Sequence, residues 1–525
     1  MKNNIKKNLI PIYLLLIYAL LLLLPIINLL RRITLNTILE LIQSNQFVNA
    51  FKNSIILSFI STVISILLAI ITSLCIERTN IKFKKYFQYI FIMPMLLPSI
   101  SHSFGLVSLF GRNGIISKLI GFDIGIHGAK GIVFGSVLYS FPVAFIIFQN
   151  ILKYEDGSVY NVCKIMKIPT FNQFKDITFP YLKKTFILAF FSVFAMIITD
   201  YGVPIMIGAK TITLPVLMYN KTIASLDYNT GACISLFLLF PAILAFILDF
   251  VFNDYKKDKY VNEKISIIKN GPRDFIAYCI CILCSLFIVI ILFTYVLILF
   301  AKKYPINLSF TLSHIVKTIN RGALLNLKNS FIVAVFTSII GTIFAFISAY
   351  ITTRLDIKYK KIIHLLSVIS MAIPGIIIGF SYLISFKGSL LYGTFAILVI
   401  VNVFHFISSP YTMAYNSLHK INYNIESVGQ ILGLSRFNII LNVIIPKIKN
   451  TLLEMFLYFF TNSLMTISAV AFLVPPAPRQ VSLMINQFND QLLIECAAFV
   501  SLIILISNLL VRVLLISISK INKKK

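Results

Sequence analysis

Charged side chains are scarce in this 525-residue chain, at 12% of residues, and only 18 of them are acidic against 47 Lys and Arg. A soluble domain carries about 25% charged and about 45–50% apolar residues, whereas 58% of this chain is hydrophobic. The composition therefore excludes a predominantly soluble protein. Apolar runs of roughly 20 residues, long enough to cross a ~30 Å hydrocarbon core as helices, recur along the whole sequence. They predict an all-α, polytopic membrane protein in contact with the lipid bilayer, because helices satisfy their own backbone groups in lipid.

Motifs for nucleotide binding and for common hydrolytic chemistry are also missing. There is no GxxxxGK[ST] loop to cradle phosphates, and neither HExxH nor GxSxG occurs. Seven cysteines are present, mostly inside apolar segments, where a thiol acts as a small hydrophobe. Cys279, Cys281 and Cys284 have metal-like spacing but no histidine nearby, so we expect neither a metal site nor a disulfide framework. These absences predict that the chain is not an enzyme.

The formal net charge of +29 raises the possibility of a nucleic-acid partner, which would need basic residues clustered on one accessible face. The basic residues instead lie between apolar runs, as expected for cytoplasmic loops, so no nucleic-acid partner is expected. Roughly 32 of the cations fall on the predicted cytoplasmic side and roughly 15 outside, in agreement with the positive-inside rule. Four exceptions would face outward: Lys302, Lys303, Lys317 and Arg321.

Twelve spans are predicted, with both termini cytoplasmic. Lys2, Lys6 and Lys7 precede a first apolar run that is too long for a cleaved signal peptide and ends in Arg31 and Arg32. The charged stretch 255–274 predicts a cytoplasmic linker between six spans and six more. The predicted spans lie near residues 9–30, 53–76, 87–110, 131–151, 182–207, 230–253, 275–300, 328–353, 361–385, 391–416, 449–474 and 493–517.

The two halves, 1–254 and 275–525, repeat one another in parallel order. Short matches recur at one constant offset and pair 52–56 with 328–332, Arg78 with Arg354, 81–85 with 357–361, and 98–100 with 374–376. Six spans in each half make both halves face the same way, which predicts a twofold axis along the membrane normal and a substrate path between the halves. Pro98 and Pro374 predict a kink or a break in the third span of each half.

The segment from Asn422 to Lys447, NYNIESVGQILGLSRFNIILNVIIPK, is neither a span nor a simple turn. Glu426 opens a predicted short helix, Gly433 follows it, and Pro446 stands at the entry to the next span. Gly433 permits a tight bend, and Pro446 suits a position without a backbone donor. The order of an acid, small residues, Leu-Gly and aliphatic-Pro resembles the EAA loop of type I, MetI-like permeases of binding-protein-dependent ABC importers.

This resemblance covers residues 50–510 and implies two tandem MetI-like six-helix repeats, similar to the fused permeases for ferric iron, thiamine or phosphonate-type compounds. In that family the loop docks as a short cytoplasmic helix on an ATPase subunit. The loops would span 422–446 and, aligned on Pro180, 154–180. The first loop departs from the pattern, because Glu155 and Asp156 lie ahead of the glutamate position; Asp156 aligns with Asn422, where either can cap a helix. The residues implied for coupling are Glu426, Ser427, Gly429, Gly433, Pro446, Tyr160, Lys167 and Pro180.

The resemblance also implies that the fifth span of each repeat lines the translocation path. Segments 200–204 and 466–470 fall at equivalent places when the two loops are aligned on their prolines. Gly202 and Pro204 weaken a helix locally, which suits backbone that lines a cavity. Asp200 is the strongest ionisable candidate, since charges in spans are costly; its alternative role is a helix end facing water. The expected path residues are Asp200, Tyr201, Gly202, Pro204, Thr466 and Ser468.

The partners implied by the resemblance are a cytoplasmic ABC ATPase in two copies and an extracytoplasmic solute-binding protein. ATP would bind to the ATPase, and no cofactor to this chain. A phosphonate-type compound or ferric iron is favoured as substrate, ahead of thiamine and polyamines. An ion-gradient-driven secondary transporter is the alternative, but it needs charge pairs at the midplane, and acids are scarce in the spans. A structural membrane scaffold would explain the duplication but not the coupling loops.

Overall fold

The computed structural model describes residues 2–252, 265, 267, 269–473 and 479–524. Eight helices in these residues are long and apolar enough to cross a membrane, and three bent helix pairs raise the candidate spans to eleven. The predicted all-α polytopic fold is confirmed, but the count of twelve is not. The helix at the predicted eleventh span, α24 (Ile445–Met465), is not among the eleven, and it carries Lys447, Lys449 and Glu454, which lower its hydropathy.

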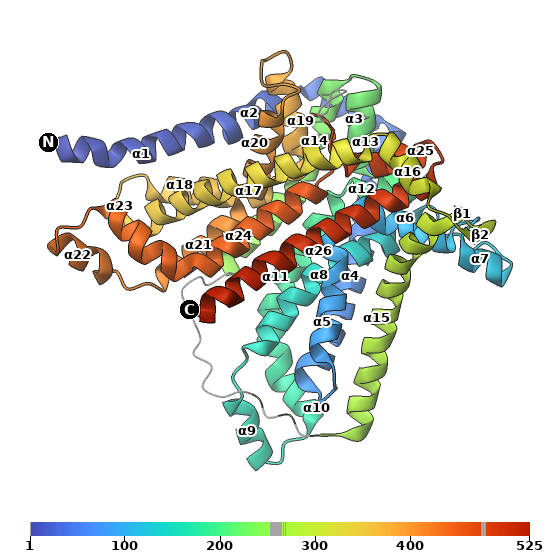
Figure 1. The fold of residues 1–525 in the computed structure, drawn as a ribbon, viewed down its shortest axis with the longest axis horizontal. Coiled ribbons are helices and arrows are strands. Elements are labelled where there is room, and N and C mark those ends of the chain that lie inside the picture. The colour runs from blue at the N-terminus through green and yellow to red at the C-terminus, as the bar shows by residue number, and fades with distance from the viewer. Residues whose placement is uncertain (1, 253–264, 266, 268, 474–478, 525) are drawn as a thin grey trace.

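The described residues of the first half form fourteen α-helices joined by short connections (Figure 1). Its elements are α1 (Lys2–Tyr18), η1 (Ala19–Leu23), α2 (Leu24–Leu30), α3 (Leu35–Gln43), α4 (Asn45–Arg78), α5 (Lys84–Ile92), η2 (Met93–Leu96), α6 (Ser99–Phe110), α7 (Ile115–Ile120), α8 (Ala129–Lys153), α9 (Ser158–Ile165), α10 (Thr170–Gln173), η3 (Phe174–Thr178), α11 (Phe179–Ile198), α12 (Gly202–Ile207), α13 (Leu214–Tyr219), η4 (Asn220–Ala224) and α14 (Tyr228–Phe252).

The second half adds a small hairpin to the same plan. Its two strands pair antiparallel, with Ala301 opposite Phe310 and Lys303 opposite Asn307. Its elements are α15 (Gly271–Phe300), β1 (Ala301–Lys303), β2 (Asn307–Phe310), α16 (Ser313–Asn320), α17 (Ala323–Arg354), α18 (Lys360–Ile369), η5 (Ser370–Ala372), α19 (Gly375–Phe386), α20 (Phe395–Phe406), α21 (Ser408–His419), α22 (Asn424–Ile431), α23 (Arg436–Ile439), η6 (Ile440–Ile444), α24, α25 (Leu483–Asp490) and α26 (Ile494–Lys524).

Most of the predicted linker 255–274 lies outside the described residues, and its last four residues are helical because α15 begins at Gly271. Asn270 caps this helix through its side-chain oxygen, which accepts a hydrogen bond from the backbone N–H of Arg273 at 3.3 Å. In Figure 1, α22 lies at the left and α9 at the bottom, both away from β1, β2, α16 and α25 at the right. We call the side that carries α9 and α22 the loop side, and the side that carries β1, β2, α16 and α25 the hairpin side.

The sequence repeat reappears as repeated contacts. The Ser54 hydroxyl oxygen accepts from the backbone N–H of Leu214 at 2.7 Å, and the Ser330 hydroxyl oxygen accepts from that of Val481 at 2.7 Å. The third span is broken in both halves, by 103° before α6 and by 108° before α19. Pro98 and Pro374 are the N-cap residues of these two helices, so the predicted proline breaks are present.

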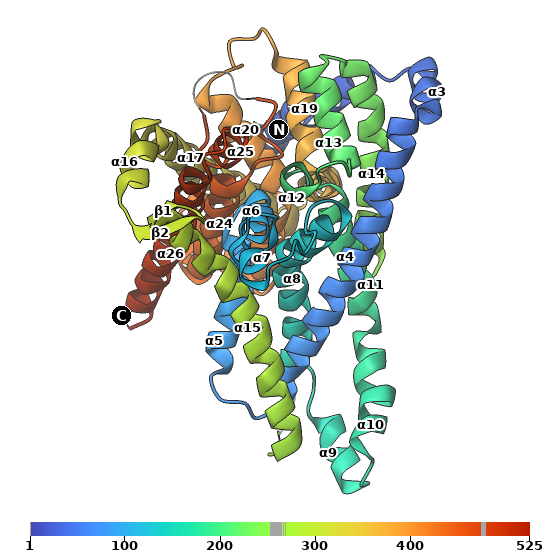
Figure 2. The ribbon, with the colours of Figure 1, turned by 90° about the vertical axis from the view of Figure 1, so that its right-hand side faces the viewer.

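The two halves exchange their first helices. Tyr18 of the first half is fully buried, and its hydroxyl lies 2.7 Å from that of Ser367 and 3.3 Å from that of Ser348. In return, the ring of Tyr295 on α15 stacks on Phe104, 5.9 Å between centroids. Figure 1 shows α1 and α2 beside α18 and α19, and Figures 1 and 2 show α15 beside α5. Each half is therefore completed by a helix from the other.

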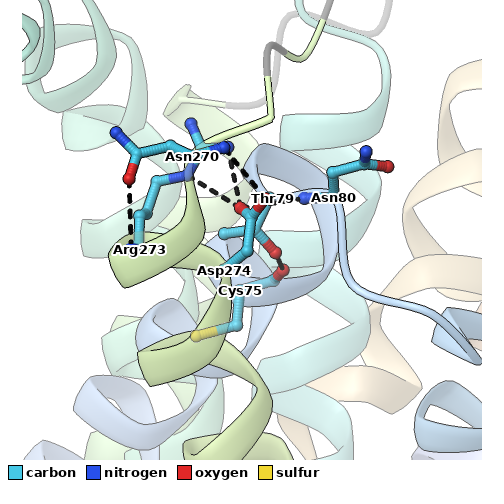
Figure 3. Close-up of polar contacts among 6 residues, drawn as sticks. All are labelled: Cys75, Thr79, Asn80, Asn270, Arg273 and Asp274. Atoms are coloured by element: carbon cyan, nitrogen blue, oxygen red, sulfur yellow. Dashed lines mark hydrogen bonds and ion pairs between the residues drawn. The ribbon is translucent and has the colours of Figure 1, made fainter.

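Polar contacts tie the start of α15 to the end of α4 (Figure 3). The Asp274 carboxylate accepts from the backbone N–H of Asn80 at 3.2 Å, from the backbone N–H of Asn270 at 3.1 Å and from the Arg273 guanidinium at 2.8 Å. Cys75 of α4 and Cys281 of α15 are both buried in the core where these two helices pack together. The second half thus enters its first span along a helix of the first half.

Candidate functional site

The two predicted coupling loops have the same construction when they are aligned on Pro180 and Pro446. In each, a short helix (α9 or α22) is followed by α10 or α23, a one-turn π-helix and a long span, α11 or α24. Asp156 and Asn422 both stand just ahead of the first helix. Their side-chain oxygens accept from the backbone N–H groups of Ser158 at 3.1 Å and Asn424 at 3.0 Å. In both loops a side-chain oxygen just ahead of the first helix thus satisfies one of its first backbone N–H groups, although the N-cap residue of α9 itself is Gly157.

Each loop is joined to its span without a break in the helix. The elements α10, η3 and α11 are contiguous in sequence, and so are α23, η6 and α24. Pro180 and Pro446 are exposed in the first turn after each π-helix, where the missing N–H is tolerated. Gly429 is buried, and a Cβ on it would lie 2.6 Å from Ile439, so this glycine lets α22 pack closely on α23. A displacement of α22 is therefore transmitted to the span that follows.

A buried arginine anchors the second loop to the end of α17. The Arg354 side chain is 1% exposed, and its guanidinium lies 3.5 Å from the Glu426 carboxylate. It also donates to the backbone oxygen of Ile421 at 2.8 Å and stacks 4.6 Å from the ring centroid of Tyr423. Glu426, expected to present its charge to a partner, is thus paired within the chain, whereas its neighbour Ser427 is exposed.

The first loop carries a similar anchor, but here the acidic residue precedes the aromatic residue in the sequence. Arg78, at the end of α4, forms an ion pair with Glu155 and lies 5.1 Å from the ring centroid of Tyr160. The Tyr160 hydroxyl donates to Glu155 at 2.7 Å and lies 2.7 Å from the hydroxyl of Thr178. Tyr160 aligns with Glu426, and Glu155 aligns with Ile421. Sequence alignment missed Glu155 because its carboxylate reaches the arginine from a different turn of the loop.

Burial controls the protonation of this anchor. It raises the pKa of the Glu155 carboxyl above its ordinary value, while the hydrogen bond from Tyr160 and the charge of Arg78 lower it. Burial also raises the pKa of the Tyr160 hydroxyl, so the phenol stays protonated and remains a donor. The Tyr160 hydroxyl and Arg78 therefore both favour the charged form of the Glu155 carboxyl.

Lys167 takes the place of Gly433 without changing the backbone. Gly433 has φ +76°, and Lys167 has φ +52°, so both residues are in the left-handed region that ends a helix. A lysine in that conformation costs about 1–2 kcal/mol relative to a right-handed one. The Lys167 side chain is exposed, and no atom lies within 4 Å of a Cβ placed on Gly433. The bend is thus retained in the loop that lacks the glycine.

Both loops expose the same apolar side chains, which the motif comparison did not identify. Ile165 is 82% exposed and its counterpart Ile431 is 84% exposed. The full matched set consists of Val162 and Val428, Ile165 and Ile431, Met166 and Leu432, and Phe171 and Phe437. The alignment of the two loops on their prolines, applied position by position, would have found these pairs. Exposed apolar residues grouped in this way are typical of a protein interface.

The two predicted path segments pack on the broken third spans through exchanged small residues. A Cβ on Gly202 would lie 2.2 Å from the Ser99 hydroxyl oxygen, and one on Gly375 would lie 2.7 Å from the Ser468 hydroxyl oxygen. Gly202 is the counterpart of Ser468, and Ser99 is the counterpart of Gly375. Each contact therefore holds one glycine and one serine, in opposite order in the two halves.

Asp200 is a helix cap inside the protein. Its carboxylate is buried and accepts from the backbone N–H of Val203 at 2.8 Å at the start of α12, which also contains the buried Pro204. Asp200 and Pro204 line a small cavity of about 10 Å³, together with Ser54 and Thr213; this is close to the volume that one water molecule needs. In the second half the buried Thr466 has a structural contact instead, because its backbone oxygen accepts from Ser482 at 2.9 Å.

Aromatic rings connect the two path segments across the interface between the halves. Tyr201 lies 4.7 Å from Tyr219, and Tyr219 lies 5.6 Å from Phe472 of the second half. Phe472 in turn lies 5.5 Å from Phe380, and Phe380 lies 6.2 Å from Tyr228 of the first half. The rings therefore form a continuous chain of contacts across the interface between the halves.

Comparison with known proteins gives the same twofold division. Residues 61–256 and 341–520 match the family described as "Binding-protein-dependent transport system inner membrane component". The chain belongs to this family. Each matched segment of this inner membrane component contains one predicted coupling loop and one predicted path segment. The exchanged helices α1, α2 and α15 lie outside the matches, which accords with their position across the interface.

Several curated relatives of this inner membrane component are known. The "Putative ferric transport system permease protein FbpB 1" of Haemophilus influenzae is 23% identical over 467 residues, which cover 84% of this chain and 73% of the relative. The "Ferric transport system permease protein FbpB" of Actinobacillus pleuropneumoniae is 23% identical, over 86% of this chain and 69% of the relative. The "Putative 2-aminoethylphosphonate transport system permease protein PhnU" of Salmonella typhi is 21% identical over 39% of this chain and 74% of the relative. The resemblance to fused importer permeases is therefore confirmed.

Proposed function

We propose that this chain is the membrane-spanning permease of an ABC importer, supplies both of its halves, and is driven through α9 and α22 by two copies of a cytoplasmic ATPase. The loop side is then cytoplasmic, together with both termini, and the hairpin side faces outward. ATP is bound and hydrolysed by the partner, so the permease itself is non-catalytic. A solute-binding protein delivers the substrate to the outer face.

The single observation that carries this proposal is the matched apolar set on the two loops. Ile165 and Ile431 are more than four-fifths exposed, on short helices that are not among the candidate spans. Leaving such side chains in water costs about 1.5–3 kcal/mol each, relative to burial. Their occurrence at the same positions in both halves fits two equal copies of one partner.

The two arginine anchors would transmit a movement of the loops to the spans. Arg78 and Arg354 hold each loop against the end of the second span, and a continuous helix joins each loop to the fifth span. A push on α9 or α22 therefore moves two spans of its half as a unit. Closure of the ATPase pair would bring the loops together and alternate access at the aromatic contact of Tyr219 and Phe472.

We propose ferric iron as the substrate, ahead of a phosphonate-type compound. The support is the similarity to two ferric transport permeases over most of the chain, against about two fifths for the aminoethylphosphonate relative. Apart from Asp200, the predicted path residues have aromatic or small side chains rather than a charged cage, so the choice of substrate would rest with the solute-binding protein. Uptake of radiolabelled ferric ion, with 2-aminoethylphosphonate as the competing arm, tests the assignment in proteoliposomes.

Assembly with the ATPase tests the coupling proposal directly. We expect Ile165→Asp and Ile431→Asp to lower the amount of co-purified ATPase at least about tenfold, since a buried charge at an interface core removes several kcal/mol. Leu390→Asp is the matched control, because Leu390 is 99% exposed in the connection between α19 and α20 on the hairpin side. Unchanged ATPase recovery with both loop variants contradicts the proposal.

A further inference from the structure

The hairpin side carries a strongly basic surface, which we call the hairpin surface: residues 301–322 and the segment 111–118. Residues 301–322 contain Lys302, Lys303, Lys317 and Arg321 and no acidic residue. All four are exposed, as are Arg112 and Lys118 in the neighbouring segment. Figure 2 shows β1, β2, α16 and α7 on the same side of the molecule.

These cations have no carboxylate partners in the described part of the chain. Arg321 donates to the side-chain oxygen of Gln491 at 3.0 Å, a neutral group. The four ion pairs formed by described residues are all on the loop side or at the start of α15: Arg78–Glu155, Arg354–Glu426, Lys360–Asp356 and Arg273–Asp274. The charge of the hairpin surface is therefore not neutralised by ion pairs between described residues.

Three acidic side chains of nearby segments accept hydrogen bonds from neutral groups. Asp123 accepts from the backbone N–H of Gly125 at 2.9 Å, and Glu495 accepts from that of Tyr304 at 3.3 Å. Asp490 accepts from the side-chain amide of Asn486 at 3.2 Å. These three acids stand against six exposed cations, so the surface keeps a net positive charge.

The hairpin and its four cations, residues 301–322, have no counterpart in the first half. The corresponding connection of the first half, residues 31–44, has Arg31 and Arg32 with Glu40 and forms α3 rather than a hairpin. A device needed for insertion or for the symmetric alternation of the halves would be duplicated with the rest of the fold. An asymmetric surface instead fits a single partner that binds off the twofold axis.

A pocket gives this surface a concave centre at the junction of the halves. It has a volume of about 300 Å³ and is lined by Arg112, Lys118 and His127 of the first half and by Tyr304, Ile306 and Asn489 of the second. Beside it the hairpin exposes Ile306 at 70% and Phe310 at 72%. Cations mixed with exposed large apolar side chains around a hollow are typical of a protein interface.

We infer that the hairpin surface is the docking site for an acidic face of the solute-binding protein. The inference rests on the proposed function, which puts the hairpin side outside the cell. In that orientation Lys302, Lys303, Lys317 and Arg321 violate the positive-inside rule, so the demands of membrane insertion do not explain them. An acidic partner explains these cations, because complementary charge speeds the encounter of the partner with the surface and orients it.

The salt dependence of binding tests this inference. The chain is assembled with its ATPases in phosphatidylcholine nanodiscs, and the anchor-free solute-binding protein encoded with it is titrated by biolayer interferometry. We expect Kd to rise about tenfold between about 50 mM and about 300 mM KCl, mainly through a slower association rate. Added salt shortens the Debye length and so screens the attraction between the two surfaces. Lys302→Glu with Lys303→Glu should raise Kd at least about tenfold at the lower salt.

The matched control is Lys82→Glu with Lys85→Glu, two exposed cations on the loop side. A control pair that weakens binding as much as the hairpin pair overturns the inference, and so does a Kd that varies by less than about twofold with salt and with both substitutions. If the hairpin variant binds normally but retains less phosphatidylglycerol on purification, the surface serves lipid headgroups and the inference is wrong. Normal ATPase assembly in these cases leaves the proposed function intact, since that function fails only when assembly fails.

Discussion

Single residues in this protein are constrained by their counterparts in the other half. Gly202 faces Ser99 in the first half, and Ser468 faces Gly375 in the second. A bulkier residue at Gly202 would strike the start of α6, and one at Gly375 would strike His405 and Ser468. The exchange shows that the duplicated halves keep the sum of side-chain volumes at a contact rather than the residue at each position.

Gly202→Ala should destabilise the protein by about 1–3 kcal/mol, because its Cβ meets the Ser99 hydroxyl and, at 2.9 Å, the backbone nitrogen of Ile100. Adding Ser99→Gly should recover part of the loss, since only the side-chain clash is relieved. The Tm measured with a thiol-reactive dye in detergent checks both. Gly271→Ala is the control, as nothing lies within 4 Å of that position; equal losses at 202 and 271 would refute the argument.

At the scale of elements, the anchors decide whether the first loop is impaired. The motif comparison suggested that it was, because Tyr160 and Lys167 replace a glutamate and a glycine. The structure shows that Glu155 restores the ion pair, Lys167 restores the bend, and four apolar side chains keep their exposure. The coupling roles of these residues stay predictions, but the difference between the loops is one of sequence more than of shape.

Arg78→Ala should cost about 3–5 kcal/mol at neutral pH, because it leaves the buried Glu155 carboxylate unpaired. Glu155→Gln in that background should recover much of the loss, and the two changes together form a double-mutant cycle. Thermal unfolding of the four proteins provides the measurement. Additive effects of the two substitutions would show that the pair does not interact.

The loss of stability in Arg78→Ala should depend on pH in a defined direction. Burial raises the pKa of Glu155 in the folded protein, so protonation favours the folded state, and stability falls as pH rises through the folded pKa. Removing Arg78 removes a group that lowers this pKa. The deficit of Arg78→Ala should therefore be smaller at about pH 5 than at about pH 7.5, and a deficit that grows on acidification would contradict this account.

At the scale of the whole molecule, the exchanged first helices make the halves interdependent. Tyr18 on α1 is buried among residues of the second half, and Tyr295 on α15 is buried among residues of the first. Neither half can complete its core alone, although each carries a full set of loop and path elements. The fused chain keeps the two halves at a high effective concentration for this exchange.

Co-expressed fragments 1–254 and 255–525 should therefore associate and co-purify. Mild oxidation should join them through Cys75 and Cys281, which are both buried where α4 and α15 pack together. A mass shift on non-reducing gels, reversed by reductant, is the measurement. Cys75→Ser with Cys281→Ser serves as the control. Fragments that purify separately, or that oxidise equally in the control, would disprove the proposed interdependence.

The general fold and the family followed from features that local sequence expresses directly. Apolar runs predicted the helices, the constant offset between short matches predicted the repeat, and Pro98 and Pro374 predicted the broken third spans, all of which the structure contains. The count of twelve spans was not confirmed, because the charges of α24 obscure its apolar character. The domain boundaries at 254 and 275 also stay predictions.

The sequence by itself determined what depends on short range: helix length, hydropathy, hydrogen bonds at helix starts such as those of Asp156 and Asn422, and the repeat between the halves. Only the tertiary structure decided which residues meet. It paired Glu155 with Arg78, joined Tyr219 to Phe472, exchanged α1 and α15, and gathered unpaired cations around the hairpin. The physical reason is that an ion pair or a packed contact requires only the right atoms at the right distance, which residues from different positions in the two halves can supply equally well.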